Sequence, residues 1–240
     1  RQIQVPVPSE DPEEVVRRFQ EAITPRTRMI LCCHTINLTG QIFPVAALAD
    51  LGRRHGIPVI VDGAHALAHF DFKLSDLGVD YYATSLHKWL FAPHGTGLLY
   101  VKRDKIEGLW PLMAAPEQMD DNIRKFEEVG THPAANALAI GEALTFHQAL
   151  GPARKEARLV HLRNYWAETL MGEDDRVRLH TSLRPGLACG IANLEVQGIP
   201  ATDLRNHLWD EHQIFTVAIN HPEFQGIRVS PSVYTTKEEV

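Results

Sequence analysis

The sequence is poor in several features that are typical of particular classes of protein. Its three cysteines, Cys32, Cys33 and Cys189, are too few and too apolar in their surroundings for a disulfide framework or a zinc site. It has no HExxH motif and no run of basic residues, and its net charge is −6, which argues against a metal centre and against nucleic acid as a partner. No apolar run is long enough to cross a bilayer, so we expect no membrane association.

What remains has the composition of an ordinary globular enzyme. Hydrophobic residues make up 44% of the 240 positions and charged residues 22%, enough for one large domain or two modest ones. The vicinal cysteines alternate faces of an apolar strand and are interpreted as core residues in a reducing, cytoplasmic compartment. Arg1 is not an initiator methionine, so we expect the original N-terminus, and any export signal, to lie upstream.

Helical and strand-like patterns alternate along the first part of the chain. Helices are expected at residues 12–23 and 44–55, and strands at residues 29–34, 57–62, 79–85 and 97–102. This alternation predicts an α/β fold with a mostly parallel sheet covered by helices. We expect residues 1–150 to form this domain in part.

The pattern changes in the second part of the chain. Two helices, at residues 133–150 and 153–171, lead to a region with expected strands at 177–181, 187–196 and 214–219 and a helix near 202–212. That composition predicts a small α+β domain, so residues 151–240 are assigned to a second, C-terminal domain, also partial.

An acid and a lysine follow two neighbouring strands. Asp62 ends the first strand, and the second strand leads into Ser85-Leu86-His87-Lys88. Ligands of open α/β sheets bind at the carboxyl ends of strands. Taken alone, an Asp there is typical of a turn or cap and a Lys is typical of a solvated loop. Together, within an apolar loop, they favour an amine that forms a Schiff base and a carboxylate that keeps a ring nitrogen protonated.

These residues resemble the core of a known family. The stretch from Cys33 to Arg103 is similar to the class V aminotransferases, which are pyridoxal phosphate (PLP) enzymes. Two segments, residues 34–45 and 128–136, resemble its isopenicillin N epimerase-like branch. The family's PLP-dependent transferase large domain is implied to be incomplete here, because the segment that stacks on the cofactor ring lies before Arg1 in family members.

The resemblance also implies roles for individual residues. Lys88 takes the place of the Schiff-base lysine, and Asp62 that of the carboxylate on the pyridinium nitrogen. His65 matches a position beside the phenolic oxygen or the ring, and Asn37 matches one near that oxygen and the substrate. Ser85 and His87 match phosphate-binding positions, and Arg228, in the late motif 227–239, matches the arginine that binds the substrate carboxylate.

Thr131 has two interpretations. By resemblance, Gly130-Thr131 reaches the phosphate of the neighbouring subunit, which implies a homodimer with a composite active site. On local sequence alone, a helix N-cap before Pro133 is the better interpretation of Thr131, and the two roles are compatible.

The implied function is catalysis at the α-carbon of an amino acid, by epimerisation, elimination or transamination. Family desulfurases use a loop cysteine, but residues 206–227 contain none, and Cys189 lies in an apolar stretch expected to be a buried strand. The sequence therefore argues against a cysteine desulfurase. A catalytically silent binding or assembly module is the competing hypothesis from another class.

Overall fold

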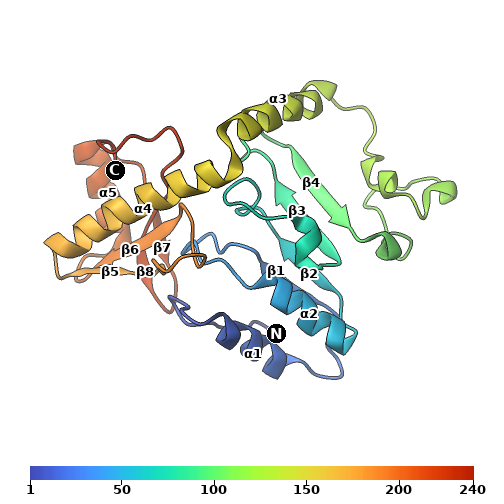
Figure 1. Ribbon diagram of the computed structural model, residues 1–240, viewed down its shortest axis with the longest axis horizontal. Coiled ribbons are helices and arrows are strands. Elements are labelled where there is room, and N and C mark those ends of the chain that lie inside the picture. The colour runs from blue at the N-terminus through green and yellow to red at the C-terminus, as the bar shows by residue number, and fades with distance from the viewer.

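The first sheet is built from the alternating segments of the N-terminal half. Its four strands are β1 (Ile30–Cys33), β2 (Val59–Asp62), β3 (Tyr81–Ser85) and β4 (Gly97–Val101), in that order. β1, β2 and β3 are parallel, and β4 runs antiparallel to β3. The computed structural model, which describes residues 1–240, therefore confirms the expected mostly parallel sheet (Figure 1).

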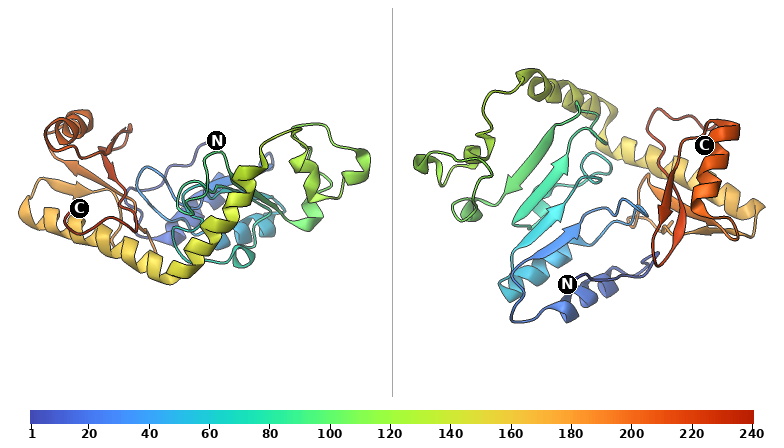
Figure 2. Two further views of the ribbon diagram at one scale, coloured as in Figure 1. Left: turned by 90° about the horizontal axis from the view of Figure 1, so that it is seen from above. Right: turned by 180° about the vertical axis from the view of Figure 1, so that it is seen from behind.

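Two amphipathic helices pack on one face of this sheet. They are α1 (Pro12–Ala22), whose first turn is capped by the Asp11 carboxylate, and α2 (Val45–His55), which ends at Gly56 in the left-handed region. Their apolar residues form a core with alternate residues of the strands: Val15, Phe19, Ile30, Cys32, Leu48, Leu51, Val59, Val61 and Tyr82. The view from behind shows no helix over the other face, where Leu31 is 67% exposed (Figure 2). The expected helical cover is thus present on one face.

Two long helices connect the first sheet to the second. α3 (Ala134–Leu150) and α4 (Pro152–Glu173) meet at Gly151, where the chain turns sharply (Figure 1). The expected boundary at residue 150 falls on this junction. α4 packs on both parts of the molecule, because Leu159 belongs to a core around the Trp89 loop and Trp166 to a core under the second sheet. The division into two domains stays a prediction.

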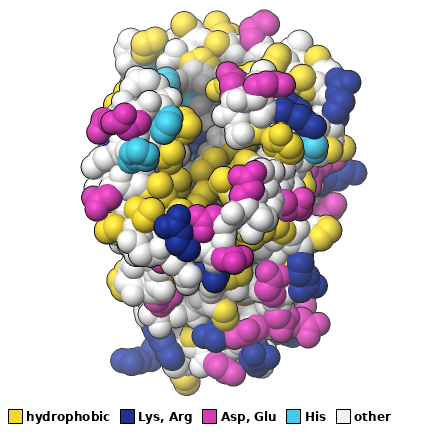
Figure 3. Space-filling view, turned by 90° about the vertical axis from the view of Figure 1, so that its left-hand side faces the viewer, with side chains coloured by type: hydrophobic (Ala, Val, Ile, Leu, Met, Phe, Trp, Pro, Cys, Tyr) yellow, Lys and Arg dark blue, Asp and Glu magenta, His cyan; other side chains and the backbone are white.

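The second sheet is antiparallel and has the order β5-β6-β8-β7. Its strands are β5 (Val177–Leu179), β6 (Ala192–Val196), β7 (Val217–Asn220) and β8 (Gln225–Val229), and α5 (Ala201–His212) packs against it. The expected small α+β part is confirmed. Figure 3 looks at this end of the molecule and shows a hollow with hydrophobic side chains on its floor and charged side chains around it.

Three expected strands of the second sheet are shorter than predicted, and β8 was not predicted. β5 ends at Leu179 and not at residue 181, and the other two strands begin late. Residues 187–191 form no strand, because β6 begins only at Ala192, and residues 214–216 precede β7. Residues 187–191 are apolar because they are buried under α4, not because they pair in a sheet. Gly190 there lies so close to Leu159 that an added Cβ would sit 3.2 Å from the Leu159 Cβ.

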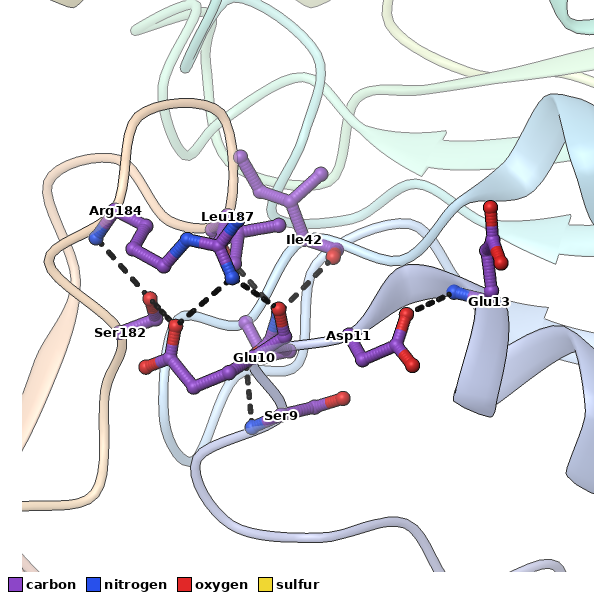
Figure 4. A network of polar contacts seen from close by, with 9 residues as sticks. Ser9, Glu10, Asp11, Glu13, Ile42, Ser182, Arg184 and Leu187 are labelled. Atoms are coloured by element: carbon purple, nitrogen blue, oxygen red, sulfur yellow. Dashed lines mark hydrogen bonds and ion pairs between the residues drawn. The ribbon is translucent and has the colours of Figure 1, made fainter.

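Polar contacts fasten the N-terminal segment to the loop that precedes β6 (Figure 4). The Ser182 hydroxyl donates to the Glu10 carboxylate at 2.9 Å, and Arg184 Nη1 donates to the Glu10 carbonyl at 2.6 Å. The Gln41 side chain accepts from the Ser9 amide at 3.2 Å and donates to the Leu187 carbonyl at 3.2 Å. These bonds help to hold the second sheet beside the carboxyl end of the first.

The segment between β4 and α3 differs from the rest of the chain. It contains only short 3₁₀ helices, at Arg103–Lys105, Glu117–Met119 and Ile123–Glu127. Trp110 and Leu112 in this segment are 92% and 101% exposed. No helix of the structure combines the length and the apolar character that crossing a membrane requires.

Candidate active site

The candidate site lies where the parallel strands end and face the second sheet (Figure 1). β2 ends at Asp62, and β3, its parallel neighbour, ends at Ser85. The Thr84 hydroxyl donates to the Gly63 carbonyl at 2.9 Å and joins the two turns that follow. Position 63 requires glycine, because a Cβ there would lie 2.1 Å from the Tyr82 ring. The structure thus places the turn of Asp62 beside the turn that leads to Lys88.

Lys88 projects from a loop that is otherwise well packed. Leu86, Trp89 and Leu90 are all buried around it. Its Nζ atom lies 3.0 Å from His65 Nε2, on the turn after β2. Burial lowers the pKa of Lys88, the Asp62 carboxylate raises it, and the Arg228 guanidinium lowers it further.

His65 is neutral at physiological pH. Burial, followed by the positive charges of Lys88 and Arg228, lowers its pKa to about 4, against the opposing effect of Asp62. A neutral His65 therefore accepts from the Lys88 ammonium through Nε2 and carries its own proton on Nδ1. That Nδ1 is buried without a partner in the chain.

Asp62 lies open to solvent at the end of its strand. One carboxylate oxygen accepts from the Ala64 amide at 2.9 Å, which orients the side chain in the turn. No cation of the chain forms an ion pair with this carboxylate; the other oxygen is left for a group outside the chain.

Arg228 reaches this site from β8 in the second sheet. Its Nη1 donates to the Asn37 carbonyl at 3.1 Å, across 191 positions of sequence. Its Nε is buried without a partner, so the guanidinium retains donors for an anion. Burial also lowers the pKa of Arg228. Asn37 contributes this backbone carbonyl, whereas its side chain makes no hydrogen bond within the chain.

The remaining predicted residues are less closely joined. Ser85 is half-buried at the end of β3, and its hydroxyl has no partner in the chain. His87 has a buried Nδ1 without a partner, and its ring lies 5.4 Å from that of His94. Thr131 is exposed and makes no polar contact with the other candidates. It is also no N-cap, because α3 begins at Ala134 with Pro133 in the cap position.

The sequence did not reveal a buried layer behind the site. His69 is fully buried and stacks on Trp89, with the ring centroids 3.7 Å apart. Lys155, which is 2% exposed, donates to the Trp89 carbonyl and lies over the Phe91 ring. The spacing of His69, four positions after His65 in an apolar turn, could have indicated its burial near the site. No sequence feature could have indicated the contact of Lys155 with Trp89, which lies 66 positions away.

One cavity of the molecule lies away from the candidate site. It has a volume of about 930 Å³ and is lined by the N-terminal segment, the end of α1, β1 and the turn between β7 and β8. Asp62, Lys88 and Arg228 do not line it. The candidate site is therefore defined by the chemistry of its side chains and not by the volume of a cavity.

Comparison with known families agrees with this arrangement. The family described as Aminotransferase class-V matches residues 2–240. The chain belongs to the class V aminotransferase family. Pyridoxal phosphate is the cofactor of class V aminotransferases, so this chain is of the PLP-dependent kind.

Relatives in the class V family differ in their described activities. The chain is 32% identical to isopenicillin N epimerase of Streptomyces clavuligerus, over 100% of this chain and 64% of that protein. It is 29% identical to a probable cysteine desulfurase of Vibrio cholerae, over 92% of this chain and 58% of that protein. A solved cysteine desulfurase from Thermococcus onnurineus NA1 shares the fold, with a TM-score of 0.81, 21% identity and coverage of 100% of this chain and 62% of that one. The chain thus spans about 64% of the length of the first of these relatives.

The residues present suit the class V cofactor. Lys88 is an amine with a lowered pKa, and Asp62 offers a carboxylate oxygen without a partner in the chain. Buried polar atoms without partners, at His65 Nδ1, His87 Nδ1 and Arg228 Nε, lie at or near the same place. Unpaired buried polar atoms are costly, and their concentration here is typical of a site that a polar ligand completes.

Proposed function

We propose that this chain provides the amine, carboxylate and substrate-carboxylate sites of a PLP enzyme acting at the α-carbon of an amino acid. The observation that carries the proposal is the meeting of three charges from distant parts of the sequence. Lys88 and Asp62 come from the first sheet, and Arg228 comes from the second and is close enough to lower the pKa of both Lys88 and His65.

Each residue has a role that follows from its surroundings. When bound, the cofactor supplies an aldehyde for an amine and a ring that withdraws electrons from the α-carbon. Lys88, with its lowered pKa, is the amine and then the base that moves the α-proton. Asp62 holds the proton on the ring nitrogen. His65 accepts a hydrogen bond from Lys88 and so holds the Lys88 amine in place.

Arg228 orients the substrate. A guanidinium donates two parallel bonds to a carboxylate and so fixes which bond of the α-carbon faces the cofactor. The bond from Nη1 to the Asn37 carbonyl restrains the side chain, while Nη2 makes no hydrogen bond within the chain and remains available. Asn37 thus acts near the substrate through this restraint. Ser85 and His87 are proposed to bind the phosphate.

The structure supports a reaction other than cysteine desulfuration. Cys189 is 1% exposed, and burial raises its pKa to about 12, so it carries no attacking thiolate at neutral pH. Its thiol donates to the His69 carbonyl at 3.3 Å. Cys189 is therefore not a persulfide-forming nucleophile. A persulfide on Cys189 after incubation with L-cysteine would contradict it.

A homodimer is part of the proposal. Thr131 is exposed, and Trp110 and Leu112 in the segment before it expose large apolar surfaces. A second copy that covers this segment would bring Thr131 to the phosphate of its neighbour. Sedimentation of the PLP-loaded protein should give twice the chain mass, and a monomer with full cofactor occupancy would refute the composite site. A cytoplasmic location stays a prediction.

One experiment separates the candidate reactions and the silent module. The protein is incubated with PLP and a panel of amino acids in deuterated water. Racemised product with deuterium at the α-carbon indicates an epimerase. Pyruvate or a homologue released together with ammonia indicates a lyase, and the keto acid of the substrate without ammonia indicates an aminotransferase. No exchange of any α-proton, from a protein that also remains colourless with PLP, would favour the silent module.

A further inference from the structure

His69 lies beneath the two turns that carry His65 and Lys88, and none of the roles above uses it. The side chain is completely buried. Its Nδ1 lies 2.8 Å from the His65 carbonyl, and its Nε2 lies 2.8 Å from the Gly190 amide. Its ring is parallel to that of Trp89, which directly follows Lys88.

The partners of His69 determine where its proton lies. An amide N–H only donates, so Nε2 accepts from Gly190 and Nδ1 carries the proton and donates to the His65 carbonyl. Burial lowers the pKa of His69 to about 3, against the raising effect of the bond to the His65 carbonyl, and the nearby positive charges of Lys155 and Arg163 lower it further. His69 is therefore a neutral imidazole in one tautomer across the physiological range.

One ring thus joins three segments that are distant in sequence. It binds the backbone of the turn after β2, stacks on the loop after β3 and accepts from the segment before β6. The His69 ring also packs closely against Gly190, since a Cβ at position 190 would lie 3.2 Å from His69 Nε2. The Trp89 carbonyl is fixed separately by Lys155. The backbones at positions 65 and 89 therefore have little freedom to move apart.

We propose that His69 is a positioning residue that sets the contact of 3.0 Å between His65 Nε2 and Lys88 Nζ, and with it the reactivity of the Lys88 amine. The proposal rests on the proposed function of Lys88. His69 touches neither the amine nor any ligand. It acts through the His65 backbone on one side and the Trp89 ring on the other.

The test compares three substitutions that separate the parts of the imidazole. His69→Asn places an amide donor near Nδ1, His69→Gln places an acceptor near Nε2, and His69→Phe keeps only a stacking ring. In cofactor-free protein, the rate at which acetic anhydride labels Lys88 is measured against pH by mass spectrometry. Exposed Lys73 in the same sample is the internal reference.

We expect His69→Phe and His69→Gln to raise the pKa of Lys88 towards its ordinary value, with labelling at neutral pH about tenfold slower. His69→Asn, which retains the donor to His65, should restore most of the wild-type rate. Leu48→Ala, in the core under α2, is the control for lost stability and should leave the labelling profile unchanged. A Lys88 profile that is the same in all variants, or that shifts equally in Leu48→Ala, would overturn the positioning role.

A second variant keeps the test decisive if His69→Phe does not fold. Gly190→Ala places a methyl group about 3.2 Å from His69 Nε2 and should displace the ring. It should therefore shift the Lys88 labelling profile in the same direction as His69→Phe. Because labelling uses cofactor-free protein, it is independent of PLP binding. If PLP is trapped on Lys88 but the labelling profile is unchanged in the His69 variants, the positioning role of His69 is rejected and the proposed function of Lys88 stands. A shifted profile without PLP on Lys88 rejects the proposed function of Lys88 and leaves the contact itself established.

Discussion

The loop that carries Lys88 and the segment that carries Thr131 are built in opposite ways. The first is anchored by buried Leu86, Trp89 and Leu90. The second, between β4 and α3, has only short 3₁₀ turns and exposes Trp110. Groups that react must be held precisely by the packing around them. The amine side of the proposed site is therefore held by the packing of this chain, whereas the proposed Thr131 contact would need a second copy.

The largest effect is expected at the anchored loop. Lys88→Ala removes the amine while its packed neighbours stay in place, so the protein should fold but lose the visible absorption band of bound PLP. Turnover should fall by about 10³-fold. Lys102→Ala, on an exposed lysine, is the matched control for absorbance and turnover. Retention of the band in Lys88→Ala would remove the lysine from its proposed role.

Arg228 tests whether the second sheet contributes to the same site. Arg228→Lys keeps the charge but loses the paired donors, and bonds to charged groups are worth about 1.5–3 kcal/mol. We expect KM for the amino acid substrate to rise about ten- to a hundredfold. An amine that lacks the carboxylate should react equally with the wild type and with Arg228→Lys. The control Arg178→Lys should change neither KM for the amino acid nor the reaction with the amine. Equal losses with both compounds would show a structural role instead.

The anchoring of the Lys88 loop can be measured through Lys155. Burial lowers the pKa of Lys155 to about 8 from 10.5. Between these pH values the folded protein has released a proton that the unfolded chain retains, so the free energy of unfolding rises with pH. Urea unfolding at several pH values should show this rise in the wild type and lose it in Lys155→Met, with Lys73→Met as the control. Identical pH slopes would contradict the buried state of this lysine.

Thr131 should give the smallest effect. Thr131→Ala removes one hydrogen bond from a hydroxyl to the charged phosphate. At about 1.5 kcal/mol, the lower end for bonds to charged groups, the affinity for PLP should fall about tenfold in the dimer. Fluorescence titration measures it, and Thr145→Ala, on exposed α3, is the control. An unchanged affinity would place the phosphate contact elsewhere.

Much of the fold was predictable because its determinants are local. Apolar periodicity and turn residues located α1, α2 and the four strands of the first sheet within a few residues. The expected parallel sheet brings the carboxyl ends of neighbouring strands together, and this placed Asp62 and Lys88 on one edge. One error occurred at residues 187–191, where burial beneath α4 produces the same apolar sequence as a strand does. Another was β8, the strand that carries Arg228, for which no strand was predicted.

Contacts between distant segments could not be predicted in this way. The bond from Arg228 to the Asn37 carbonyl and the contact of His69 with Gly190 join residues more than 120 positions apart. No pattern in either segment specifies the other. The resemblance to class V enzymes placed Arg228 and Asn37 at the site, but the use of a backbone carbonyl at Asn37 became visible only in the structure.

The most direct test of the central claim is to identify the lysine that binds the cofactor. The protein is incubated with PLP, reduced with borohydride, digested and analysed by mass spectrometry. We predict a single phosphopyridoxyl group, on Lys88, and none on buried Lys155. A group on any other lysine, or no stable labelling at saturating PLP, would contradict the assignment of this site.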